Sequence, residues 1–337
     1  MSPLDIGLLC VPGSVAGAVE EARRAQERGF ALFGVADSQS VYREMYTTLA
    51  TAAGATETIR LGATVTNPLT RHPAVAASAL ATLEELAPGR VLAAIGSGDS
   101  AILNLGLRPA RLADTAAYVT ALRELTARGA ATWRDTTLTM SWSQRAVPIW
   151  MAAEGPRTLA TAGQIADGVM INPGLRAPEL EGALARVKAG AESAGRTLDD
   201  LEVWVLARVN VTDDVEAGID EIKMELASNA NHAFRFTFEG KDVPADLQDA
   251  IRRVQSTYDP RFHEQAGGPN AALMQDPKLL HYLASRFALV GPPEAIAARL
   301  REIAATGIRG VLFTGFGVPD RPALIDALGA ARASAAR

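Results

Sequence analysis

Residues 147–172 read VPIWMAAEGPRTLATAGQIADGVMIN, and this stretch contains a complete strand–helix–strand unit. The apolar run at 148–153 predicts a short buried strand. The segment 157–166 predicts a helix that begins after Gly155-Pro156, because proline is favoured in the first helical turn. A second apolar run at 168–172 predicts the next strand. Since a helix connects them, the two strands are expected to be parallel.

The same alternation of short apolar strands and helices extends through most of the chain. The predicted strands are 6–11, 31–36, 60–66, 90–95, 148–153, 168–172, 202–211 and 310–314. Such apolar strands are typical of parallel sheets that are covered on both faces. Eight parallel strand–helix units close into a barrel. We therefore expect an α/β protein with a (β/α)8 barrel, organised as one domain over residues 1–337.

Two segments depart from this repeat. Residues 131–142 are rich in Thr and Trp and alternate in polarity, which predicts a hairpin inserted after the fourth helix. The segment 212–287 is too long for one crossover, although 215–228, 245–257 and 277–285 have helical patterns. It carries three of the four histidines, which are His232, His263 and His281. Long insertions with their own structure are usually functional, so we expect 212–287 to cap a substrate site.

The composition excludes several classes of protein. The chain has 33 Lys and Arg against 38 Asp and Glu, for a net charge of −5, and only 5% aromatic residues, which argues against nucleic-acid binding. One cysteine allows no disulfide framework, and the histidine spacing fits no metal motif. No apolar run reaches the ~18 residues of a membrane span. The first residues also lack the basic segment that is typical of a secretory signal peptide. We expect a soluble cytoplasmic protein without a metal ion.

Polar residues and glycines follow four of the predicted strands. In a (β/α)8 barrel the active site lies at the carboxyl ends of the strands, so these residues are expected to line one site. The candidates are Asp37, Ser38, Asn67, Gly96, Ser97, Gly98, Asp99, Glu154, Gly155, Arg157 and Thr158. Asp37 is expected either to accept hydrogen bonds from a ligand or to form an ion pair with Arg43. His72 is expected to anchor its loop rather than to act as a base.

The helix start at Gly155-Pro156 predicts an anion site. The free amides of Arg157 and Thr158, the helix dipole and both side chains all favour a phosphate at this position. The alternative is an ordinary helix start with a solvated arginine.

The sequence GSGDSA at 96–101 matches the dinucleotide fingerprint only formally. That fingerprint belongs to the first strand–helix turn of an open sheet, whereas this one follows the fourth predicted strand. The glycines more plausibly let the backbone approach a ligand, with Asp99 directed into the pocket. The alternative is a tight turn in which Asp99 caps a helix. Hydrolase and P-loop motifs are absent from the sequence.

At these positions the sequence resembles the luciferase-like oxidoreductases, a family of flavin- and deazaflavin-dependent enzymes that includes bacterial luciferase and the methylenetetrahydromethanopterin reductase branch. The matching segments lie in family order over most of the chain. They are LFGVADSQS (32–40), RLGATVTNPLTRHPAV (60–75), RVLAAIGSGDSAILNLGL (90–107), VPIWMAAEGPRTLATAGQIADGVMIN (147–172) and LVGPPEAIAARLREIAATGIRGVLF (289–313).

The resemblance implies roles for individual residues. In the deazaflavin branch a cis peptide forms a bulge in the third strand, which would fall at Thr64–Val65, and Asn67 would bind the pyrimidine end of the ring. Gly98 and Asp99 would lie near the ring or its side chain, and Gly96 and Ser97 would also bind the cofactor. Glu154, Gly155, Arg157 and Thr158 would lie near its phosphate. The family often has a histidine after Asp37, where this chain has Ser38. Its proton-transfer role would then fall to Ser38, Asp99 or a histidine of the insertion.

These implications leave three functions open. The first is a monooxygenase that uses reduced FMN, supplied by a separate flavin reductase, to oxygenate a small organic substrate in a dry pocket. The second is a reductase or dehydrogenase that exchanges hydride between the deazaflavin coenzyme F420 and its substrate. The third is a flavin-binding protein without catalytic activity. The family further implies a homodimer.

Overall fold

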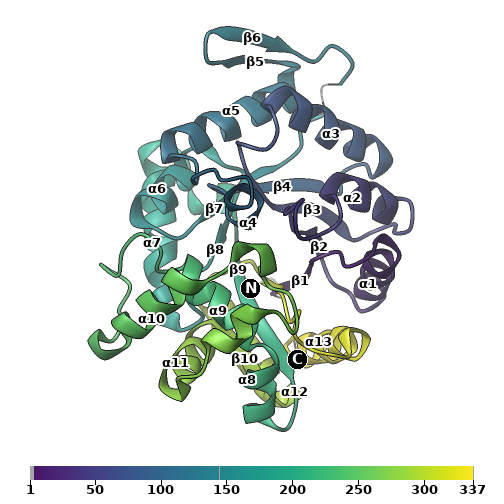
Figure 1. The fold of residues 1–337 in the computed structure, drawn as a ribbon. Coiled ribbons are helices and arrows are strands. Elements are labelled where there is room, and N and C mark those ends of the chain that lie inside the picture. The colour runs from purple at the N-terminus through teal and green to yellow at the C-terminus, as the bar shows by residue number, and fades with distance from the viewer. Residues whose placement is uncertain (1–3, 144, 337) are drawn as a thin grey trace.

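The computed structural model describes residues 4–143 and 145–336, and it contains the predicted barrel (Figure 1). Eight parallel strands form a closed ring in which each strand pairs with its neighbours in sequence and the last pairs with the first. The barrel strands are β1 (Asp5–Cys10), β2 (Leu32–Val35), β3 (Arg60–Thr66), β4 (Val91–Ile95), β7 (Ile149–Ala153), β8 (Gly168–Ile171), β9 (Glu202–Val211) and β11 (Gly310–Phe313). The fold prediction is confirmed.

Helices surround this ring, as Figure 1 shows. They are α1 (Val15–Glu27), α2 (Met45–Ala53), α3 (Pro73–Leu86), α5 (Leu112–Arg128), α6 (Pro156–Ile165), α7 (Ala177–Ser193), α12 (Pro293–Ala305) and α13 (Arg321–Ala335). Proline occupies the first turn of α3, α6, α7, α12 and α13, where its missing N–H costs nothing. Gly129 ends α5 in the left-handed conformation, with φ of 70°.

Two tryptophans fill the interior of the barrel. The rings of Trp150 and Trp204 are fully buried and lie 5.9 Å apart between centroids. A Cβ atom on Gly168 would lie 2.5 Å from Trp150, and one on Gly310 would lie 2.5 Å from Trp204. The glycines therefore make room for the indoles, and the tryptophans form part of the apolar packing inside the ring.

Two features lie outside the barrel ring. The predicted hairpin is present as β5 (Ala130–Trp133) and β6 (Thr136–Thr139), which pair in antiparallel fashion and project from the barrel. The strand β10 (Ala288–Gly291) was not predicted. It pairs with the second half of β9, beyond the part of β9 that pairs with β11. This four-residue strand lies between two helices and shows no recognisable alternation, so its sequence carried little signal.

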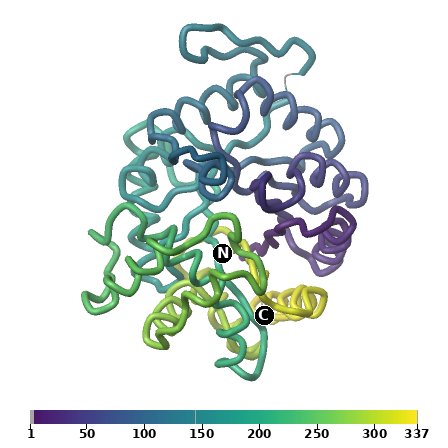
Figure 2. The backbone as a smooth tube through the Cα atoms, viewed as in Figure 1, coloured from purple at the N-terminus to yellow at the C-terminus, as the bar shows by residue number. Residues whose placement is uncertain are grey.

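The segment 212–287 contains four α-helices, which are α8 (Val215–Glu221), α9 (Lys223–His232), α10 (Ala245–Thr257) and α11 (Pro277–Phe287). The helix predicted at 215–228 is divided at Ile222 and continues to His232. These helices share an apolar cluster of their own. Figure 2 shows the segment in green on the side of β8 and β9, with β2 to β4 on the opposite side of the ring. Among the described residues no helix is both long and apolar enough to cross a membrane.

Candidate active site

A cavity of about 790 Å³ lies at the carboxyl ends of the barrel strands. Every residue that the sequence nominated for the site lines this cavity, so the topology brings all of them together. Residues from the insertion complete the lining. They are Ser228, Asn229, His232, Phe236, Thr237, Glu239, Gly240, Lys241, His263 and Glu264.

The strand β3 contributes a bulge to the cavity. The peptide bond between Thr64 and Val65 is cis, and the pairing with β4 shifts by one residue between Thr64 and Thr66. A Cβ atom on Gly34 would lie 2.0 Å from the Thr64 Oγ1, and one on Gly96 would lie 3.0 Å from the Val65 side chain. Two glycines therefore accommodate the bulge, which lies where the family resemblance implied it.

Asp37 follows β2 and is held by two partners. Its buried carboxylate accepts hydrogen bonds from Arg71 Nη1 and from Thr66 Oγ1, both at 2.6 Å. Arg71 also donates to Glu44 at 2.8 Å. The ion-pair partner of Asp37 is therefore Arg71, and the alternative pairing with Arg43 was wrong. Because both interactions are made within the protein, this geometry favours a positioning role for Asp37.

Ser38 occupies the position where the family often has histidine. Its Oγ is 2.8 Å from the Oγ of Ser100, the first residue of the short helix α4 (Ser100–Leu103), and both side chains are buried. A serine hydroxyl does not change charge near neutral pH, so this position cannot replace a histidine as an acid or base of tuned pKa.

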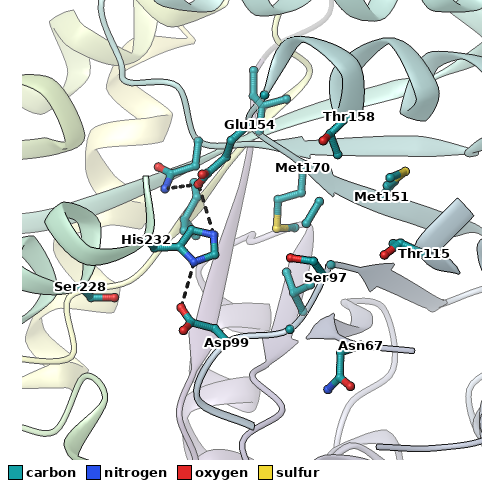
Figure 3. A pocket seen from close by; sticks show the side chains of 18 of the residues that line it. Asn67, Ser97, Asp99, Thr115, Met151, Glu154, Thr158, Met170, Ser228 and His232 are labelled. Atoms are coloured by element: carbon teal, nitrogen blue, oxygen red, sulfur yellow. Dashed lines mark hydrogen bonds and ion pairs between the residues drawn. The ribbon is translucent and has the colours of Figure 1, made fainter. Parts of the chain in front are cut away.

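Asn67 is oriented with its amide group in the lining of the cavity (Figure 3). Its Oδ1 accepts hydrogen bonds from the backbone N–H groups of Leu69 and Thr70, both at 3.0 Å. This fixes Nδ2 as the group that remains for a ligand. His72 instead caps α3, where its Nδ1 accepts from the amide of Ala74 at 3.3 Å, so its prediction as an anchor is confirmed.

The start of α6 leaves backbone donors available. Gly155 is the N-cap, and the first helical hydrogen bond runs from the Leu159 amide to the Gly155 carbonyl at 2.9 Å. The amides of Arg157 and Thr158 precede that bond, so neither has a helical acceptor. A Cβ atom on Gly155 would meet nothing nearer than the Thr158 Oγ1, at 3.9 Å. The approach to these donors is therefore open, as an anion site requires.

Arg186 of α7 is a second cation at the site that was not expected from the sequence. It lines the same cavity as Arg157. Arg157 lies on α6 and Arg186 on α7, and these two helices pack closely. A Cβ atom on Gly163 of α6 would lie 2.1 Å from a carbonyl oxygen of α7, and one on Gly190 of α7 would lie 2.0 Å from a carbonyl oxygen of α6. This contact between distant segments, which no local pattern reveals, brings the second arginine to the site.

Asp99 occupies the N-cap position of α4, but its side chain makes no capping hydrogen bond and is left for other partners. Its carboxylate faces His232, whose Nδ1 lies 2.9 Å from Oδ2, and Arg235, whose Nη2 donates to Oδ1 at 2.5 Å. Burial alone would raise the pKa of Asp99. The hydrogen bond from His232 and the charges of His232, His263 and Arg235 outweigh burial and hold that pKa well below its usual range.

His232 lies between two carboxylates (Figure 3). Its Nε2 is 3.6 Å from Oε1 of Glu154, and the same oxygen accepts a hydrogen bond from Asn172 at 3.1 Å. Burial lowers the pKa of His232, but Glu154 and Asp99 raise it by more, so the net shift is upward. A histidine of the insertion was one of the proton carriers expected from the sequence, and the structure places His232 and His263 in the cavity lining.

A second charged group joins the barrel to the insertion. Arg208 of β9 donates to Asn229 at 2.7 Å and pairs with Glu264 at 2.7 Å, while Glu225 lies 3.8 Å away. Burial raises the pKa of Glu225, Glu264 adds to that shift, and Arg208 opposes it. Within the described residues no group of three His, Cys, Asp or Glu side chains is arranged to hold a metal ion.

The family model for luciferase-like monooxygenases matches residues 7–310. The chain belongs to this luciferase-like family. Among curated relatives of this luciferase-like chain, 5,10-methylenetetrahydromethanopterin reductase of Methanopyrus kandleri is 26% identical over 329 residues, covering 90% of each chain. F420-dependent glucose-6-phosphate dehydrogenase of Beutenbergia cavernae is 37% identical over 183 residues, covering 49% of this chain and 53% of that protein.

Solved structures share the fold of this luciferase-like chain. The coenzyme F420-dependent tetrahydromethanopterin reductase of Methanopyrus kandleri matches with a TM-score of 0.80 at 23% identity, over 97% of this chain and 98% of that one. The EDTA monooxygenase of Chelativorans sp. BNC1 matches with a TM-score of 0.70 at 12% identity, over 98% and 94% of the two chains. The relatives are oxidoreductases, and this chain is an oxidoreductase of the same family. The non-catalytic alternative is therefore set aside.

Proposed function

We propose that this oxidoreductase transfers a hydride between the deazaflavin coenzyme F420 and a small organic substrate. From the sequence alone this function came second, behind an FMN-dependent monooxygenase. Two findings support the new order. Relatives with F420-dependent activities are similar in sequence as well as in fold, whereas the monooxygenases match at 12–17% identity. The second finding is the chemistry of the cavity lining.

The cavity has the size and the donors that such a cofactor needs. Its volume of about 790 Å³ lies within the usual range of ligand sites. The bulge at Thr64–Val65 and the adjacent Gly96 present backbone to a flat ring, and Asn67 offers Nδ2 to it. Arg157 and the open start of α6 suit a phosphate. Bound in this cavity, F420 would supply or accept the hydride.

The observation that carries the proposal is the set of charged side chains in the cavity lining. Asp99, His232, Glu154, Arg208 and Glu264 all line the cavity. Oxygen activation by a reduced flavin benefits from a pocket that excludes water, and charged side chains attract water. Hydride transfer to or from a heteroatom-bearing carbon needs a group that donates or accepts a proton. The charged lining meets the second need better than the first.

Cofactor binding distinguishes the two enzymatic functions. The purified protein, stripped of bound small molecules, is titrated with F420 and with FMN while cofactor fluorescence is followed. We expect tight binding of F420 and weak binding of FMN. Tight binding of FMN alone, followed by oxygen uptake with the reduced FMN complex, would instead support the monooxygenase.

The remaining features of the proposal rest on the sequence and the family. We propose that residues 212–287 cap the substrate, since they contribute part of the lining. Homodimerisation and a cytoplasmic location also remain predictions. A partner flavin reductase is needed only if the monooxygenase function applies.

A further inference from the structure

His232 is the last residue of α9, and its ring reaches from the insertion to the rim of the barrel (Figure 3). One ring nitrogen is fixed in place, because Nδ1 is hydrogen-bonded to Asp99 at 2.9 Å. Arg235 holds the other oxygen of the same carboxylate at 2.5 Å. Asp99 therefore sets the orientation of the imidazole and keeps a proton on Nδ1.

The other ring nitrogen remains available. Nε2 lies 3.6 Å from Oε1 of Glu154, which is beyond hydrogen-bonding distance. Asn172 already donates to that oxygen. The His232 side chain is 39% exposed and lines the cavity. Ser97 and Met170 line the same cavity (Figure 3). Among the described residues, an N–H group on Nε2 therefore makes only this longer ion-pair contact with Glu154, and a ligand in the cavity can compete for it.

The groups around His232 favour the protonated ring. Asp99 and Glu154 contribute negative charge from the ends of β4 and β7, and the carboxyl end of α9 favours a cation. Arg235 opposes these effects directly. His263 and Lys241 also line the cavity, and their charges act on Asp99 and Glu154. The net effect raises the pKa of His232 above its ordinary value.

We propose that His232 is the proton donor when hydride adds to a substrate carbon that is doubly bonded to oxygen or nitrogen. This inference rests on the proposed function. Reduced F420, when bound, would supply the hydride that forms a new C–H bond at the substrate carbon, and the π electrons of the double bond would move to oxygen or nitrogen. That atom would take the proton from Nε2 of His232, which would leave an alcohol or amine, a neutral imidazole and the oxidised cofactor. Solvent then reprotonates the ring.

This assignment accounts for Ser38. The position after Asp37 has no titratable group, and the insertion supplies one from the other side of the cavity. The sequence left Ser38, Asp99 and the insertion histidines open as proton carriers. Ser38 is hydrogen-bonded to Ser100, and Asp99 is held as a carboxylate by His232 and Arg235. His232 lines the cavity, and its Nε2 makes no hydrogen bond to any residue that the structure describes.

The test compares His232→Gln with His281→Gln. The glutamine amide can still donate to Asp99 but carries no transferable proton, whereas His281 lies on α11, is paired with Glu216 and does not line the cavity. Reduced F420 is mixed with a panel of small aliphatic and aromatic ketones, aldehydes and imines, and reoxidation of F420 is followed by absorbance. We expect His232→Gln to bind F420 as the wild type does and to lose about 10²–10⁴-fold in the rate of the chemical step. His281→Gln should match the wild type.

The pH profile separates proton donation from positioning. The wild-type rate should fall as the pH rises through the pKa of His232, and Asp99→Asn should move that fall to lower pH. His232→Gln should lack this dependence. An unchanged rate in His232→Gln, or a loss confined to KM with the pH profile retained, would refute the inference. Binding of F420 without turnover of any panel member would refute the substrate class, and failure to bind F420 would refute the proposed function itself.

Discussion

Asp37 follows β2 and Asp99 follows β4, and the two positions read alike in the sequence, but the structure gives them different surroundings. Asp37 is closed off by Arg71 and Thr66. Asp99 is held by His232 and Arg235 of the insertion, 133 and 136 positions further along the chain. Strand-end position predicted that both residues would line the site. It could not predict their partners, because those depend on packing between distant segments.

At the same scale, Arg157 provides a direct test of the anion site. Arg157→Ala should weaken binding of phosphate-bearing F420 and FMN by about 10- to 100-fold, the value of one charge-assisted hydrogen bond, and should leave riboflavin binding almost unchanged. Fluorescence titration measures all three ligands. Arg301→Ala, at an exposed position of α12, is the matched control. Equal losses for all three ligands would show that Arg157 has no specific contact with the phosphate.

At the scale of the elements, the stability of the contact between α9 and the barrel should depend on pH. The pKa of Asp99 is depressed, so its contribution to stability is present above about pH 4 and is lost as the pH falls towards the folded pKa. The pKa of His232 is raised, so its contribution is full below about pH 6.5 and is lost as the pH rises through the folded pKa. Both contributions are present together between these two limits.

Hydrogen exchange over residues 212–287 measures this dependence. After correction for intrinsic exchange rates, α9 should open less often near pH 5.5 than near pH 9. The lower pH lies between the reference pKa values of Asp and His, about 4 and 6.5, and the higher pH lies above both. His232→Gln should reduce the difference. His281→Gln controls for the surface pair with Glu216, in which the pKa of His281 is also raised. Equal opening at both pH values in the wild type would contradict the assigned ion pair.

The success of prediction also differs among elements. The strand β3 (Arg60–Thr66) and the helix α10 (Ala245–Thr257) have regular hydrophobic patterns, and both were predicted at their observed bounds. Hydrophobic periodicity reports local structure well. The four-residue strand β10 was missed, and the break at Ile222 was not foreseen. Both depend on pairing with β9 and packing in the insertion, which are tertiary effects that propensity does not include.

For the whole molecule, stability depends on the filled interior of the barrel. Gly310→Ala would place a methyl group 2.5 Å from the ring of Trp204 and should lower the free energy of unfolding by about 1–3 kcal/mol. Gly182→Ala is the matched control. It lies within α7 with nothing within 4 Å of a new Cβ, so it should raise stability by about 0.5–1 kcal/mol. Urea denaturation measures both, and a neutral Gly310→Ala would contradict the packing described.

The residues proposed for the cofactor and the residue proposed for the proton come from different parts of the chain. Asn67, Gly155 and Arg157 belong to the loops that follow the barrel strands, whereas His232 ends a helix of the insertion. A descendant that acquired a different segment between β9 and β10 would therefore keep its cofactor site and gain different acid–base groups. Diversification of substrates in such a lineage requires no change in the eight strands.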